Sequence, residues 1–219
     1  MSAAGAASGP AAAAAPSPAA APSPLADSAR AAGLVLAAGG ATRFGGRPKQ
    51  LASLRGRPLL QWAVDAACAA RALERVVVVL GAHADAVRAA VDFGRASVVV
   101  CERWREGQSA SLRAGLEQLE GAERVVVTLG DAPLVSTEAI ERLAAERPPA
   151  RACYDGRPGH PVLLGREQIA AAMALSGDRG ARSLLSGARL VEVGHLCSDR
   201  DVDTPRDLEE VADAASAVV

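Results

Sequence analysis

The residues best suited to chemistry begin in the stretch LVLAAGGATRFGGRPK, residues 34–49. An apolar run ends in glycines, and three cations follow: Arg43, Arg47 and Lys49. Glycine lets backbone N–H groups approach a ligand closely, and successive N–H groups can form a concave anion site. Guanidinium and ammonium groups are the side chains that bind phosphates. The stretch therefore predicts a polyphosphate site at the end of a strand.

Two carboxylates further along the chain could hold a metal ion. Asp131, in LGDAPLV, directly follows an apolar run, where a carboxylate costs free energy unless it is paired or bound to metal. Asp203, in DVDTPRDL, is the second acid, and Asp199 and Asp201 are weaker candidates. A turn residue at 131 and a helix cap at 203 are the structural alternatives. Together the two acids suit one Mg²⁺, which takes one or two carboxylates plus phosphate oxygens and water.

Two common glycine-loop motifs do not fit this chain. A Rossmann dinucleotide loop needs G-x-G-x-x-G and an acid after the second strand, but Gly39-Gly40 is followed by Ala-Thr-Arg and the later segment 80–83 contains no acid. A P-loop needs G-x-x-x-x-G-K-[ST], but Gly45 is followed by Gly-Arg. Another kind of phosphate loop is required.

The elements that must position these residues alternate along the chain. Short β-branched runs predict strands buried on both faces of a sheet, at 33–38, 75–82, 96–101 and 124–131. Helical segments lie between and after them, at 58–73, 83–91, 109–120 and 136–146. This order predicts an α/β fold of three layers, a Rossmann-like, mostly parallel sheet with helices on both faces. The glycine loop and Asp131 both fall at carboxyl ends of strands, where such sheets bind ligands.

The ends of the chain differ from this pattern. Residues 1–31 are almost entirely Ala, Pro, Ser and Gly and predict a disordered tail, which leaves 32–219 as one domain. Residues 150–200 are less regular, with one possible strand at 189–193. Thr204 and Pro205 predict the N-cap and first residue of a final helix.

The composition excludes several kinds of partner. A net charge of −1 over 219 residues leaves no basic excess for general nucleic-acid binding. Aromatic residues make up 2% of the chain, too few for a platform that stacks single-stranded bases. No apolar run approaches the roughly 20 residues of a membrane span. The four cysteines lack C-x-x-C spacing, so we expect free thiols in a cytoplasmic protein rather than a zinc site.

Taken in order, the motifs resemble those of a known family. Residues 36–39 (LAAG), Arg43, Gly45 and Lys49 match the signature L-A-A-G-x-x-x-R-x-G-x-x-x-K. The later motifs that carry the likeness are GRPLLQW, VVVVLGAHAD, WREGQSASLRAGL, LGDAPLV, RPGHPVLLG, SGDRGARSLL and DVDTPRDL. Over residues 32–212 the chain resembles the MobA-like NTP-transferase family of nucleotidyltransferases, and within it the molybdenum cofactor cytidylyltransferases.

The resemblance implies a reaction and roles for residues. A phosphorylated acceptor would attack the α-phosphate of a nucleoside triphosphate, a transfer that depends on positioning and charge neutralisation. By this resemblance Arg43 and Lys49 bind the leaving phosphates and Asp131 and Asp203 bind Mg²⁺, so Arg43, Lys49 and Asp131 are catalytic. The implied nucleotide-binding residues are Leu36, Ala37, Ala38, Gly39, Gly40, Arg43, Lys49, Gly107, Ser109 and Ser111.

The same likeness addresses the choice of base and acceptor. Ala38 resembles the cytidylyl version of the loop, since guanylyl relatives tend to have glycine there. Ser109 could read the base or simply cap a helix. The glycine- and cation-rich segment 154–186 suits a phosphorylated acceptor such as molybdopterin, through Arg157, Gly159, His160, Asp178 and Arg182. A structural role for His160 is as good a hypothesis as a binding role.

The sequence therefore predicts a cytoplasmic, Mg²⁺-dependent enzyme that transfers a cytidylyl group from CTP to molybdopterin, with a molybdenum hydroxylase receiving the product. No nucleic acid or membrane partner is expected. Three alternatives remain open: guanylyl transfer to molybdopterin, cytidylyl transfer to a sugar or polyol phosphate, and a non-catalytic chaperone that binds the finished molybdenum cofactor.

Overall fold

The computed structural model describes residues 30–40, 44 and 47–214. The predicted tail lies outside these residues except for its last two, and Ala31 is already the buried first residue of strand β1. Arg43, Gly45 and Gly46 of the glycine loop also lie outside the described residues.

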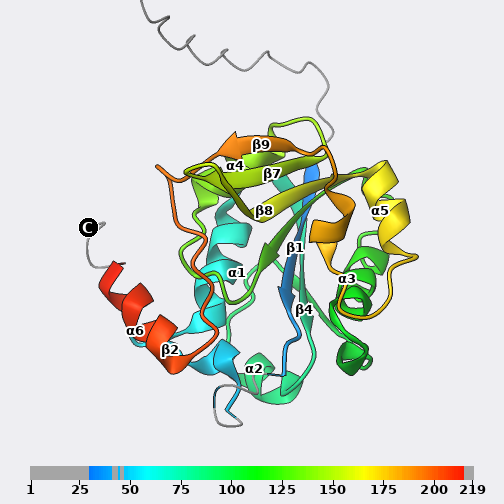
Figure 1. Ribbon diagram of the computed structural model, residues 1–219. Coiled ribbons are helices and arrows are strands. Elements are labelled where there is room, and N and C mark those ends of the chain that lie inside the picture. Colours follow the sequence, from blue (N-terminus) through cyan, green and yellow to red (C-terminus); the bar gives the residue numbers. More distant parts are fainter. Residues whose placement is uncertain (1–29, 41–43, 45–46, 215–219) are drawn as a thin grey trace, which may run out of the picture.

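One sheet of seven strands forms the centre of the protein (Figure 1). Its order is β5-β4-β1-β6-β8-β7-β9, and all its strands run the same way except β8, which is antiparallel to both neighbours. The strands are β1 (Ala31–Ala37), β4 (Leu73–Leu80), β5 (Ser97–Val100), β6 (Arg124–Leu129), β7 (Ala150–Tyr154), β8 (Arg157–Gly165) and β9 (Arg189–Glu192). All four strands that we predicted from β-branched runs are present, as the parallel part of this sheet.

Helices cover both faces of the sheet. On one face pack α1 (Leu59–Ala69), α2 (Ala84–Ala90) and α4 (Thr137–Ala144). On the other face pack α3 (Gln108–Glu117) and α5 (Arg166–Ala172) (Figure 1). Strand residues alternate between these two cores, so that Val35 faces the first and Leu34 the second. The predicted three-layer α/β fold is confirmed.

A small third core brings the end of the chain back to the glycine loop. The short hairpin of β2 (Ser53–Leu54) and β3 (Arg57–Pro58) packs against the final helix α6 (Pro205–Ala214). Leu54, Leu59, Val202 and Val211 are its buried residues. Because Val202 is anchored here, Asp203 is held near residues that follow the loop.

The caps of two helices explain where those helices begin. The Ser136 hydroxyl accepts a hydrogen bond from the N–H of Ala139 at the start of α4. At α6 the N–H of Asp207 donates to Thr204 Oγ1, and the N–H of Thr204 donates to the Asp207 carboxylate. This reciprocal pair is a capping box with Asp as its acid, so the predicted cap at Thr204 is confirmed.

The second part of the sheet is more regular than its sequence indicated. The sequence indicated only a less regular region at 150–188, yet β7 and β8 pair there, with Arg151 opposite Val162 and one register shift between Arg151 and Cys153. The prolines and glycine at 158–161 suppressed the strand signal. Within the described residues no helix is both long and apolar enough to span a membrane, and all four cysteines are free thiols.

Candidate active site

The turn that follows β1 has its carbonyl groups bonded and its N–H groups unused. The carbonyls of residues 36–39 accept four hydrogen bonds: from the N–H of Gly130 (2.9 Å), from the N–H of Ala82 (3.4 Å), and from the Gln50 side chain (2.8 and 3.1 Å). The N–H groups of residues 38–40 donate no hydrogen bond to any other described residue. Such a turn can offer consecutive N–H donors to an anion.

Gly130 lets a second strand end approach this turn. A Cβ atom on Gly130 would lie 2.8 Å from both Ala37 Cβ and Leu60 Cδ1, closer than real Cβ contacts. The absence of a side chain therefore allows β6 to end directly beside β1, and the next residue, Asp131, emerges at the turn. Two neighbouring strands thus deliver N–H donors and a carboxylate to the same place.

A pocket of about 370 Å³ opens at these strand ends. Ten of the predicted site residues line it: Leu36, Ala37, Ala38, Gly39, Gly40, Lys49, Gly107, Ser111, Asp131 and Asp178. Asp178 was assigned to the acceptor by resemblance, but it lines this pocket together with the residues assigned to the nucleotide. Gln50, Trp104, Arg105, Gln108, Leu129 and Gly130 complete the lining.

Lys49 joins the two predicted metal-binding acids. Its ammonium forms ion pairs with Asp131 and with Asp203, the latter at 3.0 Å between Nζ and Oδ1. Lys49 lies in the 3₁₀ helix η2 (Lys49–Leu51) and its side chain is 13% exposed. Burial alone would lower the pKa of Lys49, but the charges and hydrogen bonds of Asp131 and Asp203 outweigh burial and raise it. The residue therefore stays cationic at neutral pH.

The two carboxylates fit a divalent cation. Because both bond one nitrogen atom, Asp131 Oδ2 and Asp203 Oδ1 lie within reach of a single positive centre. Oxygen donors of this kind suit Mg²⁺ or Mn²⁺. No cluster of three or more His, Cys, Asp or Glu side chains in the described residues could hold a metal ion. Further ligands would thus have to come from water and a phosphorylated substrate.

Asp201 shows how much negative charge gathers here. Its pKa is raised to about 7, first by desolvation and then by the charges of Asp131 and Asp203. The nearby Lys49 ammonium opposes this shift without cancelling it. The site therefore holds more carboxylate charge than its one lysine neutralises, and a bound cation would be stabilised by the excess.

The start of α3 closes one side of the pocket. Gly107 has φ +107°, and a Cβ atom there would lie 2.4 Å from the carbonyl carbon of Gly177. The N–H of Ser109 donates to the Gly177 carbonyl at 3.1 Å. The segment around 177–180 is thereby fixed across the first turn of α3, which explains why Asp178 reaches the pocket.

The two predicted serines occupy different environments. Ser111 lines the pocket, whereas Ser109 is buried behind it and its hydroxyl has no partner among the described residues. Ser109 is also not the N-cap of α3, because Gly107 holds that position and Ser109 lies inside the first turn. Capping by Ser109 was the alternative to a binding role, but the close contact with Gly177 fixes glycine at the cap instead.

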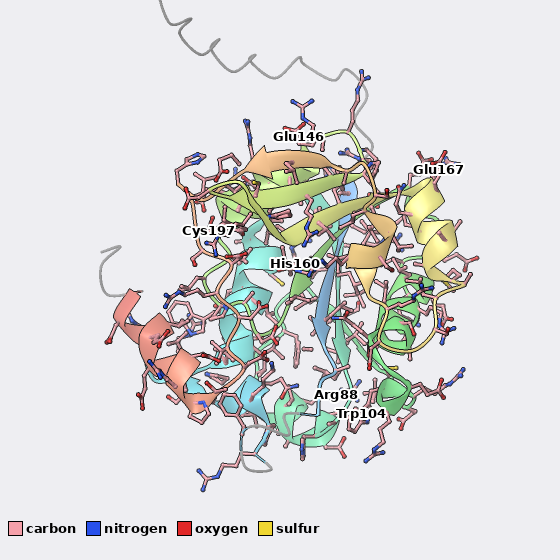
Figure 2. All side chains as sticks on the ribbon, viewed as in Figure 1. Arg88, Trp104, Glu146, His160, Glu167 and Cys197 are labelled. Atoms are coloured by element: carbon pink, nitrogen blue, oxygen red, sulfur yellow. The ribbon has the colours of Figure 1, made fainter. Side chains whose placement is uncertain are left out.

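An aromatic side chain that the sequence analysis overlooked supports the glycine turn. Trp104 lines the pocket; a Cβ atom placed on Gly40 would lie 2.8 Å from its ring, and one placed on Gly81 would lie 2.8 Å from its Cβ. The Arg105 guanidinium lies 4.5 Å from the centre of the Trp104 ring. Figure 2 shows Trp104 at the lower end of the sheet, where β1 and β4 finish. Its position just before Gly107 in the WREGQ motif was the available signal.

Three of the residues assigned to the acceptor, His160, Gly159 and Arg157, lie on β8. His160 lies in β8 (Figure 2), and burial followed by the charges of Arg151 and Arg182 lowers its pKa to about 4. Gly159 is buried against Tyr154 and Asp199. Arg157 is exposed at the start of β8, after the β7–β8 turn.

Arg151, on the neighbouring strand β7, lies near His160 and was not predicted as a site residue. Its guanidinium donates to the carbonyls of Gly159 (3.0 Å) and Pro158 (3.2 Å). Arg182 is exposed, and its guanidinium makes no hydrogen bond or ion pair with any described residue. Nothing in the sequence indicated Arg151, because only the pairing of β7 with β8 brings it beside His160.

Comparisons with known proteins identify the family to which this chain belongs. Residues 33–193 match the family described as the MobA-like NTP transferase domain. Nicotine blue oxidoreductase of Paenarthrobacter nicotinovorans is 33% identical over 177 residues, covering 74% of this chain and 86% of that protein. A 3-deoxy-manno-octulosonate cytidylyltransferase of Bdellovibrio bacteriovorus is 35% identical over 105 residues, 48% of this chain and 40% of that protein.

A solved structure shows the same fold over nearly all of its length. The crystal structure of Rv0371c from Mycobacterium tuberculosis has a TM-score of 0.75 at 31% identity, covering 85% of this chain and all of that one. A second structure of Rv0371c, in complex with manganese, gives 0.73 at 30% identity. The motifs, the fold and the family match agree, and the chain belongs to the MobA-like NTP transferase family of nucleotidyltransferases.

Proposed function

We propose that this protein transfers a cytidylyl group from CTP to the phosphate of molybdopterin and releases pyrophosphate. The observation that carries the proposal is the position of Lys49 between Asp131 and Asp203, beside a turn with three unused N–H groups. A nucleoside triphosphate brings about four negative charges and needs N–H donors, a cation and a divalent metal together. The pocket supplies the N–H groups of residues 38–40, the Lys49 ammonium and two carboxylates that could hold a divalent metal.

In the proposed reaction one bond forms and one breaks at the α-phosphorus atom. An oxygen of the acceptor phosphate bonds to the α-phosphorus, and the bond from that phosphorus to the oxygen bridging to the β-phosphate breaks. Pyrophosphate leaves with the electron pair. The second pKa of a phosphate monoester is about 6, so the acceptor is already largely dianionic at pH 7 and needs no general base. The chain's own work is to hold both phosphates in line.

Lys49 and the turn would bind the triphosphate. The N–H groups of residues 38–40 face the leaving phosphates, and Arg43, which lies outside the described residues, is assigned to them by the family motif. Lys49 would exchange one carboxylate partner for a phosphate oxygen while remaining protonated, since its pKa is raised. Charge that develops on the pyrophosphate oxygens is then stabilised by fixed donors.

Asp131 and Asp203 would hold Mg²⁺ in this proposal. The bound ion would neutralise charge on the α-phosphate and orient it toward the acceptor. The manganese in the Rv0371c structure supports a divalent cation in this branch of the family. In this chain the two carboxylates already converge on one cation, the Lys49 ammonium.

Selection of CTP rests on the pocket wall at Ala38. Ala38 is buried against Gly81 and lines the pocket, so its methyl group takes space that a purine ring would need. The Ser111 side chain and the backbone at Gly107 would contact the pyrimidine or ribose. The partial match to a cytidylyltransferase favours the same base. Guanylyl transfer is the alternative if this wall yields.

The acceptor would bind on the β7–β8 side of the pocket. The guanidiniums of Arg151 and Arg182 both influence His160, so positive charge gathers there. A neutral His160 can donate or accept a hydrogen bond from the pterin. These residues suit molybdopterin, with a sugar or polyol phosphate as the alternative acceptor, and a molybdenum hydroxylase would receive the product.

The test is pyrophosphate release with each of the four nucleoside triphosphates, in Mg²⁺, with and without molybdopterin. Release that requires both CTP and molybdopterin supports the proposal. Release with GTP keeps the reaction and overturns the assignment of Ala38. If no nucleotide gives pyrophosphate release but calorimetry detects CTP binding, the protein uses another acceptor. If CTP does not bind either, a non-catalytic cofactor chaperone is favoured.

A redox function is a second candidate because the relative with 33% identity is named an oxidoreductase. It predicts that the protein consumes NADH or NADPH when an electron-accepting dye is present. The nucleotidyltransferase proposal predicts no such consumption above the rate without protein, and both assays can be run on one preparation.

A further inference from the structure

Gln50 is a buried amide that directly follows Lys49. Its relative exposure is 3%, and it lines the nucleotide pocket. We propose that Gln50 is a positioning residue, which fixes the turn after β1 so that backbone N–H groups rather than carbonyl groups meet the phosphates. This inference rests on the proposed function for its kinetic consequences, but its structural part can be tested without turnover.

The amide holds the turn at two points. Gln50 Nε2 donates to the carbonyl of Ala37 at 2.8 Å and to the carbonyl of Gly39 at 3.1 Å. A primary amide nitrogen carries two hydrogens, so both bonds form at once. The opposite orientation of the amide would set its oxygen against two carbonyl oxygens, and the geometry therefore determines which end faces the turn.

The two bonds control the direction of the peptide groups. An amide peptide unit has its N–H and C=O pointing in opposite directions, so a carbonyl tied to Gln50 keeps the adjoining N–H on the other side. Without Gln50 the buried carbonyl of Ala37 would be left unpaired, which costs about 1–3 kcal/mol, and the more exposed carbonyl of Gly39 would be free to turn. Rotating them outward would relieve that cost but would present negative dipoles to the triphosphate.

One turn of chain couples this clamp to the charged centre. The 3₁₀ helix η2 is held by hydrogen bonds from the N–H of Leu51 to Pro48 (3.0 Å) and from the N–H of Ala52 to Lys49 (3.0 Å). This 3₁₀ helix thus directs the Lys49 ammonium toward the carboxylates of Asp131 and Asp203, and the Gln50 amide toward the carbonyls of residues 37 and 39. The position of one restricts the position of the other.

A second buried glutamine shows what a purely structural amide looks like. Gln61, on α1, satisfies both ends: its Nε2 donates to the carbonyl of Asp92 at 2.7 Å, and its Oε1 accepts from the N–H of Asp92 at 2.8 Å. Gln50 Oε1 is equally buried but has no hydrogen-bond partner among the described residues. Gln50 therefore tolerates an unpaired acceptor that Gln61 avoids, which is typical of a residue retained for a site.

The test compares Gln50→Glu with its matched control Gln61→Glu. A glutamate at 50 is isosteric, and its carboxylate would repel the two carbonyls, whereas its protonated form can donate to one of them. Burial beside carbonyl oxygens raises the pKa of such a carboxyl. We expect kcat/KM for CTP to fall about 10- to 100-fold at pH 8 in Gln50→Glu and to recover partly toward pH 6. Gln61→Glu should lose stability but keep the wild-type kcat/KM and pH profile.

A second measurement needs no activity. Amide hydrogen exchange of the sheet-bonded N–H groups at the end of β1, in peptides covering residues 31–37, should be at least about tenfold faster in Gln50→Leu than in wild type and unchanged there in Gln61→Leu. Unchanged exchange, or a Gln50→Glu pH profile that matches wild type, would overturn the inference. If wild-type protein shows no turnover, the proposed function fails and the exchange result alone decides the role of Gln50.

Discussion

The two parts of the sheet place their chemistry in different ways. In the parallel part, β5-β4-β1-β6, chemical groups come from turns that directly follow a strand: residues 38–40 after β1 and Asp131 after β6. In the part built from β8, β7 and β9, Arg151 and His160 lie within strands and meet only because those strands pair. The first arrangement is local in sequence, and the second is not.

The two parts also differ in the charges that surround their titratable side chains. Lys49 is buried with two opposite charges beside it, and its pKa is raised. On the β7–β8 side, His160 is partly buried near two guanidiniums, and its pKa is lowered to about 4. The Lys49 centre therefore places one ammonium among several carboxylates, whereas the centre around His160 places two guanidiniums near a neutral imidazole, with Asp199 close enough to act on Arg151.

The largest expected effect concerns the parallel part. Asp131→Asn should lower kcat about 100- to 1,000-fold, because it removes a charge that pairs with Lys49 and that would bind the metal in the proposed reaction. Steady-state pyrophosphate release measures it. The matched control is Asp155→Asn, on the exposed β7–β8 turn at φ 50°, a conformation that Asn tolerates. Wild-type turnover in Asp131→Asn would contradict the assignment of Asp131 to the metal and the catalytic role given to the parallel part of the sheet.

The next effect concerns the other part and depends on pH. Burial keeps His160 neutral in the folded protein, with a pKa of about 4 against an ordinary value near 6.5. Its contribution to the free energy of unfolding is fully present above pH 6.5 and is lost as the pH falls toward 4, up to about 3 kcal/mol. Urea unfolding at pH 7.5 and pH 4 should show this loss in wild type and less of it in His160→Gln. Equal losses in both proteins would mean that His160 is not buried as a neutral group.

A pair of glycine substitutions separates folding from binding. Gly107→Ala should lower the free energy of unfolding by about 2 kcal/mol, since φ is +107° and the new Cβ would overlap Gly177. Gly39→Ala has no atom within 4 Å of its new Cβ and should change that free energy by less than about 0.5 kcal/mol. Because Gly39 lines the pocket, its methyl group should instead raise KM for CTP. Reversed results would show that the pocket wall is misassigned.

The smallest effect tests the acceptor side. Arg182→Ala should raise KM for the acceptor about tenfold and leave KM for CTP unchanged, because the Arg182 side chain is exposed and bonds to no described residue. Arg142→Ala, exposed on α4, is the control. If KM for CTP changed and KM for the acceptor did not, Arg182 would belong to the CTP site. That result would contradict the assignment of the two substrates to different parts of the sheet.

Much of the parallel part could be predicted from the sequence. Its strands are continuous β-branched runs, and its chemical groups follow those runs directly, so that Lys49, Asp131 and the glycine turn were recognisable as a set. The final helix and its cap were predictable for the same reason, since Thr204-Pro205 is a local signal. These features need only a few residues to be seen.

The remaining features depend on contacts between distant segments. Strand β8 carries prolines that hide it, and Arg151 acquires a role only when β7 pairs with β8. Gln50 resembles any polar loop residue until its amide is seen beneath the turn, 11 to 13 residues earlier in the chain. Asp178 joined the nucleotide pocket because its segment is bonded to α3 through Ser109. No periodicity or motif spacing encodes such contacts.

The most direct test of the central claim is the anomalous scattering of Mn²⁺ in crystals grown with a non-hydrolysable CTP analogue. We predict one manganese ion coordinated by both Asp131 and Asp203, with the triphosphate lying along the N–H groups of residues 38–40. A manganese ion away from both carboxylates, or a nucleotide bound outside this pocket, would contradict the account.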